Sequence, residues 1–319
     1  MPKINYTASK FNNYYNLNGT YCDNISWNEI VWAAMTMGKP NISYLLRHSW
    51  HSINDLLVRL HTVYANLKET KDGYYSKSDL YIMLDPTEKC GVSYFMGMLA
   101  AKTLSARILD TPWMFHLSIL RQLGNKASLI NRSEPDLVGL DPNFNWIVAE
   151  AKGRTGSYDS LAMSKAKQQT RQLRNINGEL PILRVAIQAS FNPDLTWHIE
   201  DPEEYEETAK DLEVDLEKAM TMYYSTFLES LGQRVERINI EEETFVIYEL
   251  NNIGITICLH SDIYKMVIRG EFNIEVMQRI AKKSKKFRSE KFTFFQDGFA
   301  ISLDSKWSSE IMELDPLMR

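Results

Sequence analysis

Apolar positions recur at helical spacing in much of the first half of the chain. Within Ile42–Leu67, leucine, isoleucine and valine follow one another at intervals typical of a helix with one buried face. Trp27–Met37 and Cys90–Leu109 are further helix candidates, and a shorter helical stretch reaches Leu123. The pattern therefore predicts a mostly helical N-terminal region over residues 1–85.

The next part of the chain has shorter segments of β-type composition. Ala127–Leu140 and Trp146–Ala151 predict two strands, separated by the turn-forming residues Asp141-Pro142-Asn143. Ser164–Ile176 predicts a helix with a polar face, and Pro181–Ala189 predicts a buried strand. The predicted order is therefore helix, strand, strand, helix, strand.

The C-terminal third combines both patterns. Glu203–Leu231 predicts a long acidic helix, and Ile274–Lys283 predicts a shorter one. The strand candidates are Arg237–Ile240, Thr244–Leu250, Ile253–His260, Tyr264–Arg269 and Phe292–Leu303. We expect an α/β protein with the regions 1–85, 86–200 and 201–319, the last being α+β in character.

Charge is distributed unevenly along the 319 residues. Lys and Arg number 36 against 41 Asp and Glu, and this net charge of −5 argues against general nucleic-acid binding. However, Glu200–Glu217 holds ten acidic residues and one lysine, whereas Arg121–Arg184 holds ten basic and six acidic residues. The second stretch is therefore compatible with a phosphate-binding surface.

The cysteines indicate a reducing environment. Cys22, Cys90 and Cys258 lie far apart and form no CxxC pair, which argues against a zinc ribbon or a disulfide framework. The N-terminal residues contain no apolar signal core, and charged residues interrupt the most apolar long window, Val92–Leu109. We expect a cytoplasmic protein without membrane contact.

One group of residues stands out as a candidate for chemistry. Asp136, preceded by proline, lies within the first of the two predicted strands, and Glu150 and Lys152 end the second. Because residues two apart on a strand point to the same side, Glu150 and Lys152 project together. If the two strands pair as a hairpin, Asp136 meets them at one face of the sheet.

Two carboxylates and a lysine at one point suit phosphodiester hydrolysis. Asp136 and Glu150 could hold Mg²⁺, or Mn²⁺ in its place, and the backbone carbonyl of Ala151 could be a further ligand. The metal would lower the pKa of a bound water. Lys152 would position or deprotonate that water or stabilise the phosphate. The alternative is an ordinary surface ion pair of Lys152 with Glu150 or Asp136.

These residues resemble a known family. Pro135-Asp136 followed by Glu150-Ala151-Lys152 is similar to the motif of the PD-(D/E)xK nuclease superfamily, which has the restriction-endonuclease-like fold with an αβββαβ core. The resemblance covers roughly Cys90–Phe191. It implies Mg²⁺-dependent cleavage of nucleic acid, with Asp136 and Glu150 as metal ligands and Lys152 as the catalytic lysine.

The helix after the motif adds further candidates. In several nucleases of this superfamily a glutamine on that helix supports the active site, and this chain offers Gln168, Gln169 and Gln172, of which we take Gln168. The basic residues flanking the site in sequence are candidates for gripping phosphates. They are Arg154, Lys165, Lys167 and Arg171.

The sequence leaves several functions open. We expect a DNA nuclease of prokaryotic restriction or anti-phage defence, with nucleic acid as its partner and a protein partner or homo-oligomer as a further option. The alternatives are a nuclease of repair or recombination, and a non-catalytic protein that keeps the fold and binds nucleic acid or a partner. No GxSxG, GxxxxGK[ST] or GxGxxG motif is present, which argues against an α/β-hydrolase, a P-loop NTPase and a Rossmann enzyme.

Overall fold

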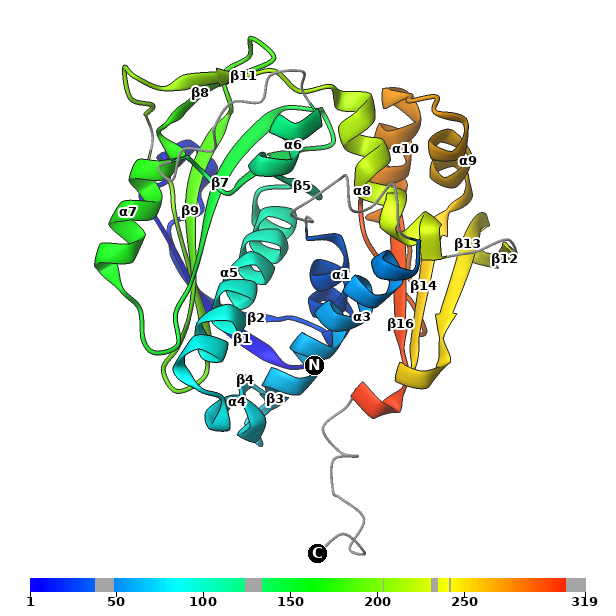
Figure 1. Cartoon of the computed structure of the whole chain (residues 1–319), viewed down its shortest axis with the longest axis horizontal. Helices are drawn as coiled ribbons and strands as arrows, with labels where there is room; N and C mark the ends of the chain where they lie inside the picture. The colour runs from blue at the N-terminus through cyan, green and yellow to red at the C-terminus, as the bar shows by residue number, and fades with distance from the viewer. Residues whose placement is uncertain (38–48, 124–133, 203, 231–234, 241, 308–319) are drawn as a thin grey trace, which may run out of the picture.

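The computed structural model describes residues 1–37, 49–123, 134–202, 204–230, 235–240 and 242–307. They form a mixed α/β protein in which a seven-stranded and a five-stranded sheet stand on either side of a layer of helices (Figure 1). Helix α5 (Pro86–Ile108) packs on one face of the seven-stranded sheet, and α7 (Ser160–Thr170) covers the other. Helix α1 (Trp27–Thr36) contacts the five-stranded sheet.

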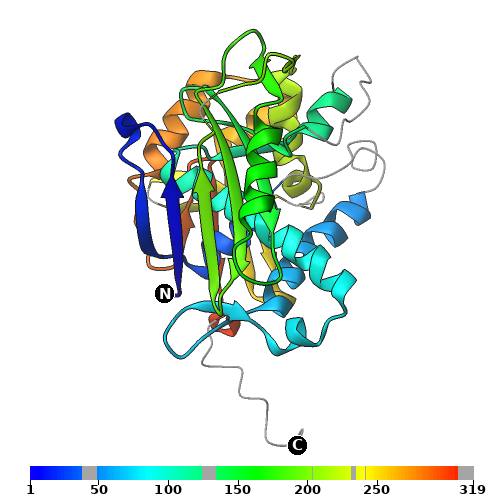
Figure 2. The same cartoon turned by 90° about the vertical axis from the view of Figure 1, so that its left-hand side faces the viewer.

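The seven-stranded sheet pairs strands from the start of the chain with strands near residue 200. In spatial order its strands are β2 (Gly19–Asn24), β1 (Lys3–Ser9), β10 (Leu195–Glu200), β9 (Leu183–Phe191), β7 (Trp146–Gly153), β6 (Leu137–Leu140) and β5 (Trp113–His116). The pairs β1–β10 and β7–β9 are parallel, and the other pairs are antiparallel. Figure 2, which faces α7, shows β1 and β2 in blue at one edge of this sheet.

The elements α5, β5, β6, β7, α7 and β9 form the centre of this half, with α6 (Leu117–Leu123) inserted after β5 and β8 (Leu173–Ile176) inserted after α7. The three strands β5, β6 and β7 form an antiparallel meander, and α7 lies in the crossover from β7 to the parallel strand β9. All nine residues of β9 are buried, as expected for a strand covered on both faces. The crossover places α7 over one face of the sheet, where it packs against β7 and β9.

Helix α5 can approach β7 closely because of two glycines. A Cβ on Gly97 would lie 2.6 Å from the carbonyl carbon of Lys152, and a Cβ on Gly153 would overlap the carbonyl oxygen of Ser93. The helix begins at a capping box formed by Asp85 and Glu88. These contacts fix the first half of α5 against the end of β7.

The C-terminal region contains the second sheet and three helices. Its strands, in spatial order, are β12 (Glu236–Ile240), β13 (Glu243–Leu250), β14 (Ile255–His260), β16 (Phe299–Leu303) and β15 (Thr293–Phe294), all antiparallel. The helices are α8 (Leu216–Ser230), α9 (Ser261–Arg269) and α10 (Ile274–Ser284). Helix α8 also contacts α3 (Ser49–Asn66), which connects this region to the helical layer.

The remaining elements are short. They are α4 (Asp79–Met83), α6 (Leu117–Leu123), the strand pairs β3 (Leu67–Glu69) with β4 (Tyr75–Lys77) and β8 (Leu173–Ile176) with β11 (Lys210–Leu212), and the 3-10 helices η1 (Asn13–Tyr15), η2 (Asn251–Ile253) and η3 (Ser305–Trp307). None of the helices in the described part of the chain is long and apolar enough to cross a membrane.

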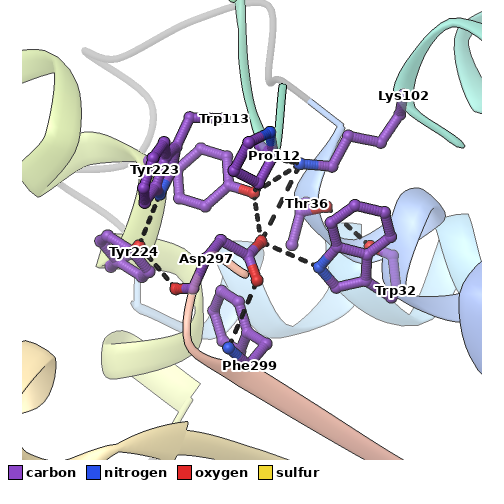
Figure 3. A network of polar contacts seen from close by, with 9 residues as sticks. All are labelled: Trp32, Thr36, Lys102, Pro112, Trp113, Tyr223, Tyr224, Asp297 and Phe299. Atoms are coloured by element: carbon purple, nitrogen blue, oxygen red, sulfur yellow. Dashed lines mark hydrogen bonds and ion pairs between the residues drawn. The ribbon is translucent and has the colours of Figure 1, made fainter. Parts of the chain in front are cut away.

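A buried polar network joins the two halves (Figure 3). Asp297, in the turn between β15 and β16, accepts hydrogen bonds from Trp32 of α1 at 2.8 Å and from Tyr223 of α8 at 2.6 Å. The Lys102 ammonium of α5 lies 3.9 Å from the same carboxylate and donates to Tyr223 and to the carbonyl of Pro112. Because burial disfavours charge, the pKa of Lys102 falls to about 7 and that of Asp297 rises.

Most of the predicted elements in the described ranges are present. The structure confirms the predicted helices that correspond to α1, α3, α5 and α10. It also confirms the predicted strands that correspond to β7, β9, β12, β13 and β14. Strand β6 covers only the last four residues of the predicted Ala127–Leu140. The predicted residues 42–48, 127–133, 203 and 231 lie outside the described residues.

The prediction of a mostly helical N-terminal region is wrong for its first 24 residues. In strand β1 the buried residues Ile4, Tyr6 and Ala8 alternate with residues that are only partly buried or exposed, which is a period of two. Strand β2 pairs with it along its whole length. The boundaries predicted at residues 85 and 200 remain predictions, although β1 and β2 are strands of the same seven-stranded sheet as β7 and β9.

Four other predictions fail in identifiable ways. The acidic segment does not form one long helix, because α8 begins only at Leu216. The predicted strand Tyr264–Arg269 belongs to helix α9, whose buried face includes Ile263 and Met266. The predicted helix Ser164–Ile176 ends at Thr170 and is followed by β8. The stretch before Leu123 begins with strand β5 before α6.

Candidate active site

The three residues of the motif lie together at the end of the meander. The pairing of Leu137 with Ala149 brings Asp136, which immediately precedes β6, beside Glu150 of β7. The backbone N–H of Asp136 donates to Oε2 of Glu150 at 2.7 Å. The ammonium of Lys152 forms an ion pair with Oε1 of the same glutamate. Glu150 is therefore held at both oxygens and is fully buried.

A glutamine of α7 completes the group, and it is Gln169. Its Oε1 accepts a hydrogen bond from Lys152 Nζ at 2.8 Å, and its Nε2 donates to the carbonyl of Glu134 at 3.2 Å. Gln168, the predicted residue, is exposed to solvent. The phase of the helix explains the correction, because Gln169 follows the buried Ala166 by three residues and shares its face.

Burial and like charge dominate the electrostatics of this group. Burial raises the pKa of Glu150 to about 8, and the neighbouring Asp136 carboxylate contributes to this rise, while Lys152 opposes both effects. Burial also raises the pKa of Asp136, again against the influence of Lys152. Because both carboxyl groups have raised pKa values, a cation bound between them would stabilise their ionised forms.

The donor set fits a hard divalent cation. Mg²⁺ commonly takes one or two carboxylates from a protein and keeps several waters, and Asp136 with Glu150 supplies two. Ala151 donates a backbone hydrogen bond to Asp136, so its backbone lies beside that carboxylate. Within the described ranges, no three His, Cys, Asp or Glu side chains form a larger metal-binding group.

Glu134 supports the site in a way that the sequence did not indicate. Its carbonyl anchors Gln169, and its carboxylate lies 2.9 Å from Arg121 of α6 and 3.7 Å from Lys210 of β11. It is buried, and it precedes Asp136 by two residues. Glu134 therefore ties the segment before β6 to α6, α7 and β11.

The structure places the predicted phosphate-binding residues on or near α7, with different surroundings. Arg154 forms an ion pair with Asp159, the residue that caps α7. Lys167 contacts Glu200 at 3.0 Å, and Arg171 donates to the carbonyl of Glu204 at 3.2 Å. The side chain of Lys165 is exposed to solvent. Their role in binding nucleic acid stays a prediction.

A second charged cluster lies on the same face of the sheet as Glu150. In the register, Glu150 pairs with Ala186 of β9 and Ala186 pairs with Glu200 of β10, so the two glutamates occupy one row. Glu200 binds Lys167 and, at 2.8 Å, Lys10. Lys10 is not among the predicted residues, because the sequence pattern did not indicate β1 or β10.

Comparison with known proteins does not extend the sequence resemblance: no family model, curated protein or solved structure matches this chain.

Proposed function

We propose that this protein is a metal-dependent nuclease that hydrolyses phosphodiester bonds with Mg²⁺, or with Mn²⁺ in its place. The observation that carries the proposal is the convergence of Asp136, Glu150, Lys152 and Gln169 on one point of the sheet. The elements α5, β5, β6, β7, α7 and β9 follow the αβββαβ order of the PD-(D/E)xK superfamily, which the motif resembles, with α6 inserted after β5 and β8 inserted after α7. We place the protein in that superfamily as part of the proposal.

The chain's own residues have separable roles in this reaction. Asp136, Glu150 and the Ala151 carbonyl would hold the cation, which supplies an acidified water and neutralises charge on the phosphate. Lys152, which contacts Glu150 and Gln169, would stabilise the phosphate or position the attacking water. Gln169 is a positioning residue, since it orients Lys152.

We favour DNA as the substrate and restriction or anti-phage defence in the cytoplasm as the context, both from the resemblance. The test is incubation of the purified protein with plasmid DNA and with structured RNA in Mg²⁺, Mn²⁺ or EDTA. We expect cleavage that requires the metal and that Asp136→Asn and Lys152→Ala both lose. Cleavage that survives both substitutions would exclude this site as the catalytic centre, and binding without cleavage would favour the non-catalytic alternative.

The glutamine provides a matched pair of variants. Gln169→Ala removes the hydrogen bond to Lys152, so we expect a roughly 10- to 100-fold lower rate, the size of effect typical of lost supporting contacts around a metal site. Gln168→Ala alters an exposed neighbour on the same helix and should cleave at the wild-type rate. Equal activity of the two variants would contradict the role given to Gln169.

A further inference from the structure

A cavity of about 580 Å³ lies between α3 and the first half of α5. Its volume is within the range of sites for small molecules. The walls are mainly apolar and include the aromatic ring of Phe95 and the side chains of Val58 and Met98. The polar residues of the lining are Asp55, Arg59, Thr62, Asn66, Glu88 and His116. The cavity is therefore suited to a flat ligand that combines an apolar face with polar edges.

The cavity adjoins the candidate active site. Tyr94, which lines the cavity and is 48% exposed, has a raised pKa because its ring is partly desolvated and because the charges of Asp136 and Glu150 act on it. The backbone nitrogen of Tyr94 would lie 2.8 Å from a Cβ on Gly153, which follows Lys152. On another side His116 lines the cavity, and its neighbour Leu117 donates to the carbonyl of Asp136 at 2.9 Å.

One polar atom in the cavity wall lacks a partner. Asn66 is 6% exposed, and its Nδ2 donates to the carbonyl of Thr62 at 2.8 Å. Its Oδ1 is buried and has no hydrogen-bond partner within the described structure. A buried acceptor left without a donor is costly, so a ligand whose N–H group reaches Asn66 would remove that cost.

We propose that this cavity binds one unpaired nucleobase of the strand whose phosphate lies at Asp136 and Glu150, an inference that rests on the proposed function. A nucleobase offers a flat ring that stacks on aromatic side chains and ring or exocyclic N–H groups for the Oδ1 of Asn66. A base inside a duplex must first be unpaired and unstacked, whereas a base in a single strand enters at little cost. The substrate is therefore single-stranded DNA, or a duplex with an unpaired nucleotide at the cleavage site.

Gly91 allows a direct test because it lines the cavity from the surface of α5. A Cβ at this position would meet no atom within 4 Å, so Gly91→Ala introduces no clash. We expect the alanine to leave the cavity open and the larger tryptophan side chain to obstruct it. The probe is a fluorescein-labelled single-stranded DNA, compared with the same sequence as a blunt duplex and with a single strand that contains abasic positions.

Fluorescence anisotropy with Ca²⁺ in place of Mg²⁺ measures affinity without requiring turnover. We expect wild type and Gly91→Ala to bind the single strand at least tenfold more tightly than the duplex. Because stacking contributes a factor of about 10 to 100 per base, Gly91→Trp or abasic positions should remove that preference. Equal affinity of all three proteins for all three probes overturns the inference.

Cleavage in Mg²⁺ separates this inference from the proposed function. If all three proteins cut duplex and single strand equally well, the nuclease stands and the base-binding cavity is refuted. If wild type cuts nothing but still prefers unpaired DNA in a manner that Gly91→Trp abolishes, the cavity stands and the nuclease is refuted.

Discussion

Glu150→Gln should remove a large pH dependence from the stability of the metal-free protein. A solvated glutamate carboxyl, as in the unfolded chain, has a pKa of 4.5, and burial is the main reason why the folded-state pKa of Glu150 is about 8. Between these values the folded state binds the proton more tightly than the unfolded state, so stability is greatest below pH 4.5 and falls as pH rises to 8. At about 1.36 kcal/mol per pH unit the loss amounts to roughly 5 kcal/mol.

Urea unfolding at pH 5 and at pH 8.5 in EDTA measures this loss. The wild type should lose several kcal/mol that Glu150→Gln retains, because the glutamine cannot ionise and can still accept the hydrogen bond from the N–H of Asp136. Titrating groups away from the site are common to both proteins, so the difference reports Glu150 together with its interaction with Asp136. The control is Glu217→Gln, which changes an exposed glutamate of α8.

The same experiment tests metal binding without an activity assay. Mg²⁺ binds the ionised pair, so at about 100 times its dissociation constant it should restore about 2.7 kcal/mol at pH 8.5 and much less at pH 5. Glu150→Gln should respond weakly at both pH values. The reasoning is refuted if the wild type is equally stable at pH 5 and pH 8.5, or if the variant keeps the full slope.

Three further predictions concern the scaffold. Gly97→Ala should lower the free energy of unfolding in urea by about 1–3 kcal/mol, because its Cβ overlaps the backbone of β7, whereas Gly91→Ala on the same helix should raise it by about 0.5–1 kcal/mol. Equal effects of the two substitutions would contradict the close approach of α5 to β7. Asp297→Ala should lower the free energy of unfolding by about 3–5 kcal/mol, and adding Lys102→Met should recover part of that loss. A double-mutant cycle measures the coupling, and strict additivity of the two substitutions would argue against it. A thiol reagent should label two cysteines in the native protein and three in denaturant, since only Cys258 is buried, and rapid labelling of all three would refute this burial.

The central part of the candidate site could be predicted from the sequence because that part depends on local rules. Glu150 and Lys152 share a side through strand alternation, and Asp136 follows from the pairing of two neighbouring strands. Gln169 depends on the phase of α7, which is set by the Asp159 cap and the buried Ala166. The sequence pattern alone does not determine that phase, and it therefore indicated the adjacent Gln168.

The missed parts of the fold depend on contacts between distant segments. Strands β1 and β10 are short and alternate polar with apolar residues, so each is a weak signal until the other lies beside it. The opposite error occurred at Tyr264–Arg269, whose β-branched and aromatic residues indicated a strand. There a helical arrangement buries Ile263 and Met266 on one face, and this tertiary packing overrides local propensity.

The position of β1 has a consequence for how the chain folds. The strand partner of β1 on the core side is β10, and Lys10 meets Glu200 across a separation of 190 residues. During synthesis β1 therefore cannot pair with β10 until about two hundred residues have been made. The seven-stranded sheet gains β1 and β2 only after β10 has emerged from the ribosome. Such non-local pairing slows folding, and until it forms β10 presents an open edge to other chains. Aggregation during expression should therefore depend on how quickly the first nine residues find that edge.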